Sequence, residues 1–371
     1  MAYPPKIKFS GRRGGAANTP RQTQPRRESA AEEAFQGETL NLRIDSVAPG
    51  GKALARNADG RVVFVDLGVP GQELKAEVIR SKSGYLEARR LEVLKRAPYE
   101  EEPFCEYFGR CGGCVWQEIP YARQLELKRA HILENLTRIG GLREAAPGAA
   151  GPDLEAVTAP VLPSPLLRHF RGKIELVFGE RPGEAAPLLG FRRLGGHEVV
   201  DVAVCPIADA RLPELLNLVK AWAAESGLRA YRQEAASGGG GERDLSSVLR
   251  FLVLRTSRAT GLAAAELITA PAPQAARRFK VLGEKLLSEL PWLESFTHSV
   301  RREQSALAFG EEILLSLGAP RLRESLAGFA YELSPAAFFQ TNPAAAESLV
   351  SEAVRLLAPQ EGEVVWDLYC G

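Results

Sequence analysis

The chain has 371 residues, of which 45% are hydrophobic and 25% are charged, an ordinary composition for a protein with a folded core. This length predicts about two to four domains of roughly 100–200 residues each. The 47 Lys and Arg residues balance 46 Asp and Glu residues, so the net charge of +1 offers no argument for nucleic-acid binding. No apolar run approaches the roughly 18 residues that suggest a membrane span, and the N-terminal sequence MAYPPKIKFSGRRGG does not have the apolar core of a secretory signal. These values exclude a membrane protein, a secreted mini-protein and a fully disordered chain, and we expect a cytoplasmic protein without a membrane partner.

Residues 1–36 are rich in Pro, Gly, Ser, Gln and Ala, and their seven basic and three acidic residues give a net charge of +4. A segment with so little apolar surface to bury is expected to be a disordered basic tail. Its charge can add affinity for phosphate groups, and a solvated leader without a role fits the composition equally well.

Residues 37–97 have a different pattern. Apolar and polar residues alternate within 40–44, 61–67, 73–80 and 85–94, and turns that contain Gly or Pro separate these runs. Four or five short alternating strands in about 60 residues predict an OB-like β-barrel. Such barrels often bind nucleic acid, although a fold alone does not establish a function.

Residues 98–325 are predicted to form a mixed α/β domain. Apolar residues at helical spacing indicate a helix from Tyr121 to Ile139, which the pair Gly140 and Gly141 ends. The other expected elements are strands at 173–179, 197–204, 248–256 and 262–269 and helices at 212–224 and 274–290. The Gly-rich stretch 237–244 is expected to be a surface loop and not a phosphate cradle, because no strand leads into it and no helix follows at once.

Residues 326–371 are typical of the beginning of another α/β domain. A short strand ends near Pro335, and a helix follows with Asn342 as its N-cap and Pro343 as its first residue. Its expected apolar face comprises Ala346, Leu349, Val350, Ala353 and Leu357. The sequence EVVWDLYCG (363–371) predicts a buried strand that runs into a Gly loop. One helix and one strand cannot form a stable parallel sheet, so we expect the polypeptide to be a fragment or its reading frame to end early.

Three of the five cysteines, Cys105, Cys111 and Cys114, form a C-x5-C-G-G-C pattern, and Cys205 follows about 90 residues later. Five cysteines are too few for a disulfide scaffold, so their clustering indicates a metal or cluster site in a reducing compartment. Structural zinc sites usually combine two closely spaced Cys pairs, whereas a triplet with a distant fourth ligand favours a [4Fe–4S] cluster. Zinc and unliganded buried thiols are the alternatives at this point.

The segment EPFCEYFGRCGGCVWQEIPYARQLELKR (102–129) closely resembles the iron–sulfur segment of the RNA 5-methyluridine methyltransferase family, including Gln117 and the pair Gln124 and Lys128 that follow the cysteines. Three further segments resemble the same family, in the same order along the chain. They are residues 38–96, which are similar to its TRAM domain; GFRRLGGHEVVDVAVCPI (190–207), which is similar to the stretch that supplies the fourth cluster cysteine; and LSPAAFFQTNPAAAESL (333–349) with WDLYCG (366–371), which resemble the entry into its S-adenosylmethionine domain.

The resemblance implies a multidomain α+β and α/β fold. Its parts would be an OB-like TRAM β-barrel (37–97), a mixed α/β central domain with a [4Fe–4S] cluster held by the four cysteines (98–325), and the start of a doubly wound methyltransferase domain that binds S-adenosylmethionine (326–371). It also implies methyl transfer from S-adenosylmethionine to C5 of a uridine in RNA. In that reaction a Cys thiolate adds to C6, which makes C5 nucleophilic, and a carboxylate later removes the C5 proton.

The expected partner is 23S rRNA and not DNA, because in this family a TRAM barrel with a cluster accompanies rRNA substrates more often than tRNA substrates. A tRNA substrate remains an alternative. Two other classes also compete with the enzyme: a non-catalytic RNA-binding module with a structural cluster, and a zinc-stabilised RNA-binding protein.

The resemblance also implies cofactor-binding residues. Gln340 matches the family Gln that contacts the cofactor, and Tyr369 matches the aromatic residue of the first cofactor loop. Asp367 and Gly371 lie at the expected C-terminal edge of the first strand, where open α/β sheets bind ligands. The family nucleophile and proton-abstracting Glu are expected after Gly371, so we assign no catalytic residue and expect the chain alone to be inactive. Cys370 belongs to the cofactor loop and is expected to be an inert packed thiol.

Three basic residues, Arg171, Lys173 and Arg192, are candidate contacts for RNA phosphates because they lie next to predicted strands. A solvated surface role is the alternative for each of them.

Overall fold

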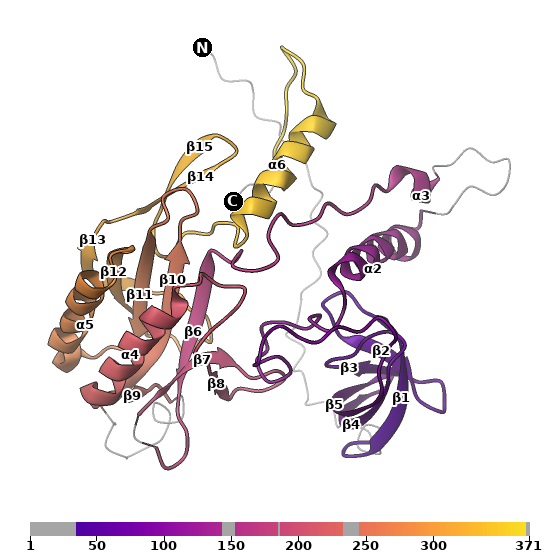
Figure 1. Cartoon of the computed structure of the whole chain (residues 1–371), viewed down its shortest axis with the longest axis horizontal. Helices are drawn as coiled ribbons and strands as arrows, with labels where there is room; N and C mark the ends of the chain where they lie inside the picture. The colour runs from indigo at the N-terminus through magenta and orange to yellow at the C-terminus, as the bar shows by residue number, and fades with distance from the viewer. Residues whose placement is uncertain (1–34, 143–152, 185, 233–244, 369–371) are drawn as a thin grey trace, which may run out of the picture.

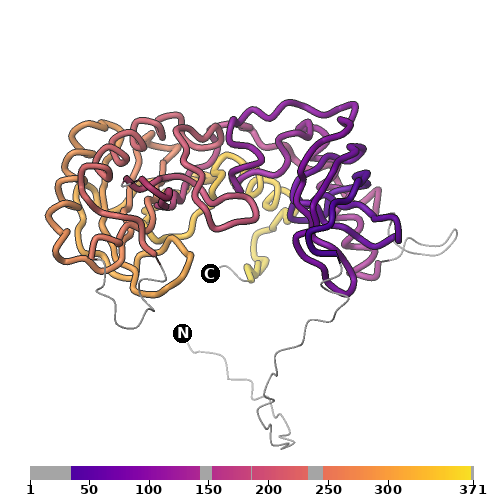
Figure 2. Tube along the Cα trace, turned by 90° about the horizontal axis from the view of Figure 1, so that it is seen from below, coloured from indigo at the N-terminus to yellow at the C-terminus, as the bar shows by residue number. Residues whose placement is uncertain are grey.

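The computed structural model describes residues 35–142, 153–184, 186–232 and 245–368. Most of the expected basic tail lies outside these ranges, as do the Gly-rich stretch 237–244 and the residues Tyr369, Cys370 and Gly371. A small barrel lies at one end of the molecule and a larger sheet at the other, with the C-terminal helix between them (Figures 1 and 2). Within the described ranges, no helix is both long and apolar enough to cross a bilayer.

The N-terminal unit is a closed barrel with the strand order β1-β2-β3-β5-β4. Its strands are β1 (Thr39–Val47), β2 (Ala53–Arg56), β3 (Val62–Val65), β4 (Glu73–Lys82) and β5 (Tyr85–Lys95). Alternate side chains of each strand point inward, so the alternating sequence pattern places the apolar residues in the barrel core. Leu42, Ile44 and Leu74 are all at most 3% exposed. The predicted small barrel is therefore confirmed.

A long loop and one helix follow the barrel. Helix α2 (Tyr121–Glu134) continues into the π-helical turn η1 (Asn135–Ile139), so the predicted extent of this helix is confirmed. His131 on α2 packs against the barrel, since its Nε2 lies 2.6 Å from the carbonyl oxygen of Val47. The short helix α3 (Leu154–Val157) comes next along the chain.

The central unit is built on an eight-stranded sheet with the order β13-β12-β11-β10-β6-β7-β8, and β9 pairs with β10 beside this path. The strands are β6 (Lys173–Gly179), β7 (Leu188–Arg192), β8 (Val199–Asp201), β9 (Arg229–Ala230), β10 (Ser247–Thr256), β11 (Ala263–Thr269), β12 (Leu293–Val300) and β13 (Glu312–Gly318). Helices α4 (Leu212–Ser226) and α5 (Ala276–Glu289), the latter preceded by the 3-10 turn η3 (Pro273–Ala275), lie on one face of the sheet (Figure 1). Leu216 of α4 and Phe279 of α5 share a single core with Leu252 of β10.

The expected strands at 173–179, 248–256 and 262–269 correspond to β6, β10 and β11. The strand expected at 197–204 is wrong in extent, because β8 covers only Val199–Asp201 and the chain then turns toward Cys205. Strand β12 was not predicted from the sequence. Its buried segment, LESFTHSV, is mostly polar and lacks the alternation of a half-exposed strand.

The C-terminal segment begins with a hairpin of β14 (Leu322–Leu326) and β15 (Phe329–Leu333), followed by α6 (Pro343–Leu357). The Asn342 side chain accepts a hydrogen bond from the backbone N–H of Ala345 at 3.1 Å, which confirms the predicted N-cap. Only the first turns of α6 are buried, and Leu349 on its expected apolar face is 62% exposed.

The strand expected at 363–371 is not present in its described part. Residues 363–368 have no strand assignment, and Trp366 is 79% exposed. A buried strand is held by hydrogen bonds to its neighbours, and no strand of the described ranges pairs with this segment. The described part of residues 326–371 thus contains a hairpin, α6 and an exposed extended segment, and the doubly wound domain expected there stays a prediction.

Candidate functional site

The four cysteines of the predicted cluster site converge on one cavity. Cys105, Cys111 and Cys114 lie on the loop between β5 and α2, and Cys205 lies between β8 and α4. All four line a cavity of about 160 Å³. The structure therefore brings the remote cysteine to the other three, as the sequence hypothesis requires.

The Gly pair in C-G-G-C allows the loop to lie close to the neighbouring strand connection. The backbone N–H of Gly112 donates to the carbonyl oxygen of Arg192 at 2.9 Å. A Cβ at Gly112 would lie 3.3 Å from that oxygen and 3.4 Å from the Cα of Leu194. The N–H of Gly113 points at the Sγ of Cys111, 3.4 Å away. A side chain at Gly112 would thus crowd the neighbouring strand connection, whereas a Cβ at Gly113 would meet only the Cys111 Sγ, at an ordinary contact distance of 3.5 Å.

Polar contacts join the two cysteine-bearing segments. The Tyr107 hydroxyl accepts a hydrogen bond from the backbone N–H of Ala203 at 3.0 Å, which holds the Cys loop beside the segment that carries Cys205. The Gln117 Oε1 accepts from the N–H of Cys105 at 3.1 Å, and its side chain also hydrogen-bonds the Cys114 side chain. Gln117 was singled out only by family resemblance, and the structure gives it a physical role.

The thiols occupy an environment that opposes their ionisation. Burial raises the pKa of Cys111, Cys114 and Cys205, and repulsion from the neighbouring cysteine sulfurs raises it further. Arg171 acts in the opposite direction, because its positive charge lowers the pKa of Cys114. Thiolates in such a site need a cationic partner, and a bound metal centre is the usual one.

This donor set fits an inorganic centre that is bound by four thiolates. Within the described residues, however, no group of three or more His, Cys, Asp or Glu side chains has the arrangement of a preformed site for a metal ion. The four cysteine side chains nevertheless all line the same cavity.

The candidate cofactor residue Gln340 lies on an exposed loop between β15 and α6. Two hydrogen bonds hold this loop to the central unit. The guanidinium of Arg255 donates to the carbonyl oxygen of Ala337, and the N–H of Gly172 donates to that of Thr341 at 2.7 Å. Sequence reasoning missed Arg255, whose position opposite this loop no local pattern reveals. Asp367 is exposed, and Tyr369 and Gly371 lie outside the described residues.

The three candidate RNA contacts occupy different surroundings. Arg171 lines the cysteine cavity, and its Nε donates to the carbonyl oxygen of Lys173 at 3.0 Å. The Lys173 ammonium is paired with Glu175 at 2.7 Å and is only 20% exposed. Arg192 lines a second cavity, of about 560 Å³, at the end of the sheet.

Comparison with known proteins places this architecture in a family. The TRAM domain family matches residues 33–91, which cover the barrel except the end of β5. An uncharacterized RNA methyltransferase of Nitratidesulfovibrio vulgaris is 37% identical over 335 residues, which are 90% of this chain and 67% of that protein. Another, of Thermosynechococcus vestitus, is 32% identical over 339 residues, 91% of this chain and 69% of that protein.

The chain belongs to the RNA methyltransferase family. It spans about two thirds of the length of these relatives. The crystal structure of the Pyrococcus abyssi tRNA (uracil-54, C5)-methyltransferase in complex with S-adenosyl-L-homocysteine has a similar fold, with a TM-score of 0.57 at 21% identity. That likeness covers 85% of this RNA methyltransferase chain and 65% of the crystallised chain.

Proposed function

We propose that this RNA methyltransferase chain is part of an enzyme that transfers a methyl group from S-adenosylmethionine to C5 of a uridine in 23S rRNA. The observation that carries the proposal is the convergence of four cysteines, from segments about 90 residues apart, on one cavity in a chain of this family. The family membership supports an RNA methyltransferase. The motif resemblance described above supports C5 of uracil as the methylated atom and rRNA as the substrate.

The four cysteines would hold a [4Fe–4S] cluster. When bound, the cluster supplies iron centres that coordinate the thiolates and so link the loop before α2 to the segment before α4. Gln117 would hold Cys105 and Cys114 in place, and Arg171 would offset part of the negative charge of the thiolates. Within the chain these residues serve to bind and orient the inorganic centre, and none of them is assigned a step in methyl transfer.

Gln340 would contact the cofactor from the loop between β15 and α6. Because Arg255 and Gly172 hold the two ends of this loop, its position relative to the central unit is fixed without any contact by Gln340 itself. Tyr369, Asp367 and Gly371 are proposed to belong to the same cofactor site. No residue of the chain is assigned as nucleophile or as proton-abstracting base.

The substrate assignment can be tested by nucleoside mass spectrometry of 23S rRNA and tRNA that are purified separately from a strain lacking the gene. We expect 5-methyluridine to fall in 23S rRNA, to stay unchanged in tRNA, and to return when the gene is restored. A loss confined to tRNA would support the tRNA alternative instead. Unchanged 5-methyluridine in both RNAs would leave the non-catalytic RNA-binding module as the better explanation.

A further inference from the structure

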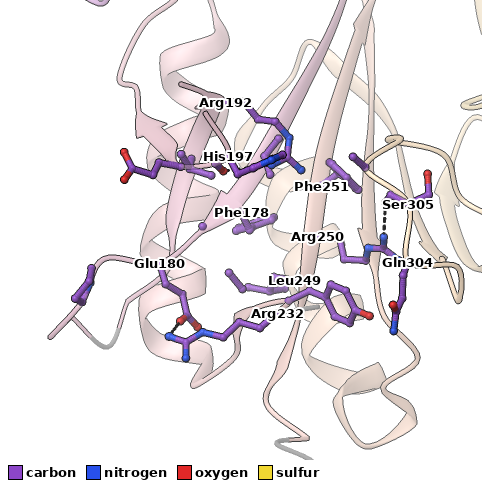
Figure 3. A pocket seen from close by; sticks show the side chains of 18 residues that line it. Phe178, Glu180, Arg192, His197, Arg232, Leu249, Arg250, Phe251, Gln304 and Ser305 are labelled. Carbon is purple, nitrogen blue, oxygen red and sulfur yellow. Dashed lines mark hydrogen bonds and ion pairs between the residues drawn. The ribbon is translucent and has the colours of Figure 1, made fainter. Parts of the chain in front are cut away.

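A feature that the proposed function leaves unexplained is the cavity of about 560 Å³ at the end of the central sheet (Figure 3). Its walls come from β6, β7, β10, the segment after β9 and residues 304–306. Phe178, Leu249 and Phe251 are among its apolar lining residues and are at most 4% exposed. A concave apolar surface with a few polar groups around it is the usual form of a ligand site.

The rim of this cavity is positively charged. Glu180 is held between Arg229 and Arg232, and Glu198 is paired with Arg193 at 3.0 Å. Arg192 and Arg250 line the cavity without a carboxylate among their hydrogen-bond acceptors. Among the described residues, the charged side chains that line this cavity are the guanidinium groups of Arg192, Arg232 and Arg250 and the carboxylates of Glu180 and Glu198, and the neighbouring cavity adds Arg193 and Glu175. An anionic ligand would meet an excess of positive charge.

Arg250 and Tyr231 form a cation–π pair in the wall. The Arg250 guanidinium lies 4.7 Å from the centre of the Tyr231 ring and donates to three backbone carbonyl oxygens, those of Arg301, Glu303 and Ser305. These bonds fix the guanidinium plane, so its position does not depend on a ligand. Aromatic rings and guanidinium planes are the surfaces on which unpaired RNA bases stack.

The cavity continues toward the cysteine loop. A neighbouring cavity of about 410 Å³ shares Val177, Arg192 and Phe251 with it and reaches Gly112 and Gly113. Figure 3 shows Arg192 on one side of Phe178, with Arg232 and Glu180 on the other. Together the two cavities form one continuous groove with the basic side chains of Arg192, Arg193, Arg232 and Arg250 along it.

We propose that this groove binds a single-stranded segment of the RNA substrate, with one base stacked in the cavity beside Tyr231 and its flanking phosphates near Arg192 and Arg232. The proposal rests on the proposed function, since it names a second contact region for the same RNA. An RNA strand and a free nucleotide both present an aromatic base with a phosphate. The continuation of the groove into the neighbouring cavity favours the strand as the ligand.

The test measures binding of a fluorescein-labelled single-stranded oligoribonucleotide to the whole chain, over a salt series. We expect the double variant Arg192→Gln/Arg232→Gln to bind at least about tenfold more weakly at low salt. Each phosphate contact to a single strand contributes about 0.7 to the slope of log K against log salt, so loss of two contacts should reduce the slope by about 1.4. The matched control Arg277→Gln/Arg278→Gln removes the same charge from exposed positions on α5, which lines neither cavity, and should leave the slope unchanged.

Stacking is tested separately. Tyr231→Ala should weaken binding and Tyr231→Phe should restore it, and an oligonucleotide with 4-thiouridine should crosslink to the peptide containing Tyr231. Equal losses in the two double variants, or a crosslink elsewhere only, would overturn the proposal. Free uridine monophosphate that binds as tightly as the strand would instead identify a mononucleotide site and also overturn it. If the wild-type chain binds no RNA at all, the proposed function itself is contradicted.

Discussion

Gln117 shows how a single side chain positions two candidate ligands. It accepts a hydrogen bond from the backbone of Cys105 and also bonds the side chain of Cys114. Resemblance singled this residue out, but its contacts explain why a Gln is suitable, because the amide offers both an acceptor and donors. The four cysteines could be grouped from the sequence because the spacing of thiols is chemically specific. The partners Tyr107 and Arg171 could not, since they act only once the chain is folded.

His298 is expected to make the free energy of unfolding depend on pH. It is 3% exposed on β12, between Leu267 of β11 and Leu315 of β13, and its ring lies 4.2 Å from that of Phe279. Burial lowers its pKa from 6.5 to about 4, and Thr269 is its hydrogen-bond partner. The folded protein therefore keeps this histidine neutral, whereas the unfolded chain binds a proton below pH 6.5. Stability is lost as the pH falls through this window, by about 2 kcal/mol between pH 7.5 and 5.

Urea unfolding at a series of pH values checks this expectation. His298→Gln should remove most of that loss and leave a flatter pH profile, while His197→Gln, at an exposed position, should keep the wild-type profile. An unchanged profile in His298→Gln would show that other groups cause the acid sensitivity.

At the scale of elements, the barrel strands and β6, β10 and β11 could be predicted because apolar residues follow the period of their element. The polar strand β12 and the short β7 could not. The burial of β12 depends on pairing with β11, about 30 residues earlier, and β7 has only five residues in which to show a pattern. The same dependence explains the segment 363–368. Its apolar composition suggested a buried strand, but without a paired neighbour among the described residues it is exposed.

Packing of α5 on the sheet provides a prediction at this scale. A Cβ on Gly283 would lie 2.3 Å from Cδ1 of Phe296 and 2.8 Å from Cδ1 of Leu317. Overpacking costs about 1–3 kcal/mol, and replacing Gly by Ala within a helix returns at most about 1 kcal/mol. We expect Gly283→Ala to lower the free energy of unfolding by about 1–2 kcal/mol.

Thermal and urea unfolding measure this effect. Gly84→Ala is the matched control, because its Cβ would meet no atom within 4 Å and its backbone does not have a positive φ. A Gly283→Ala variant as stable as the wild type would contradict the close packing of α5 against β12.

At the scale of the whole molecule, the barrel is coupled to the cysteine loop. Arg90 on β5 is paired with Glu118 of that loop at 2.7 Å, and both side chains are less than 15% exposed. Removing one partner of a buried pair leaves an uncompensated charge, which costs more than removing both. Arg90→Met alone should therefore destabilise the loop by about 2–3 kcal/mol, and adding Glu118→Gln should recover much of that.

Hydrogen exchange of the loop amides between residues 105 and 120 measures this coupling in Arg90→Met, Glu118→Gln and the double variant. If the double variant exchanges as fast as the sum of both single effects predicts, the pair does not connect barrel and loop. No sequence pattern predicts such contacts, or the groove of the central unit, because their residues come from segments that only the folded chain brings together.

The central claim is that Cys205 completes a cluster site with the three cysteines of the loop. The most direct measurement is the iron and sulfide content, with the visible absorption, of anaerobically purified wild type, Cys205→Ser and Cys370→Ser. The account predicts brown wild type with about four iron and four sulfide per chain, the same values for Cys370→Ser, and a loss of most iron and colour for Cys205→Ser. Colourless wild-type protein with one bound zinc, or Cys205→Ser with undiminished iron, would contradict it.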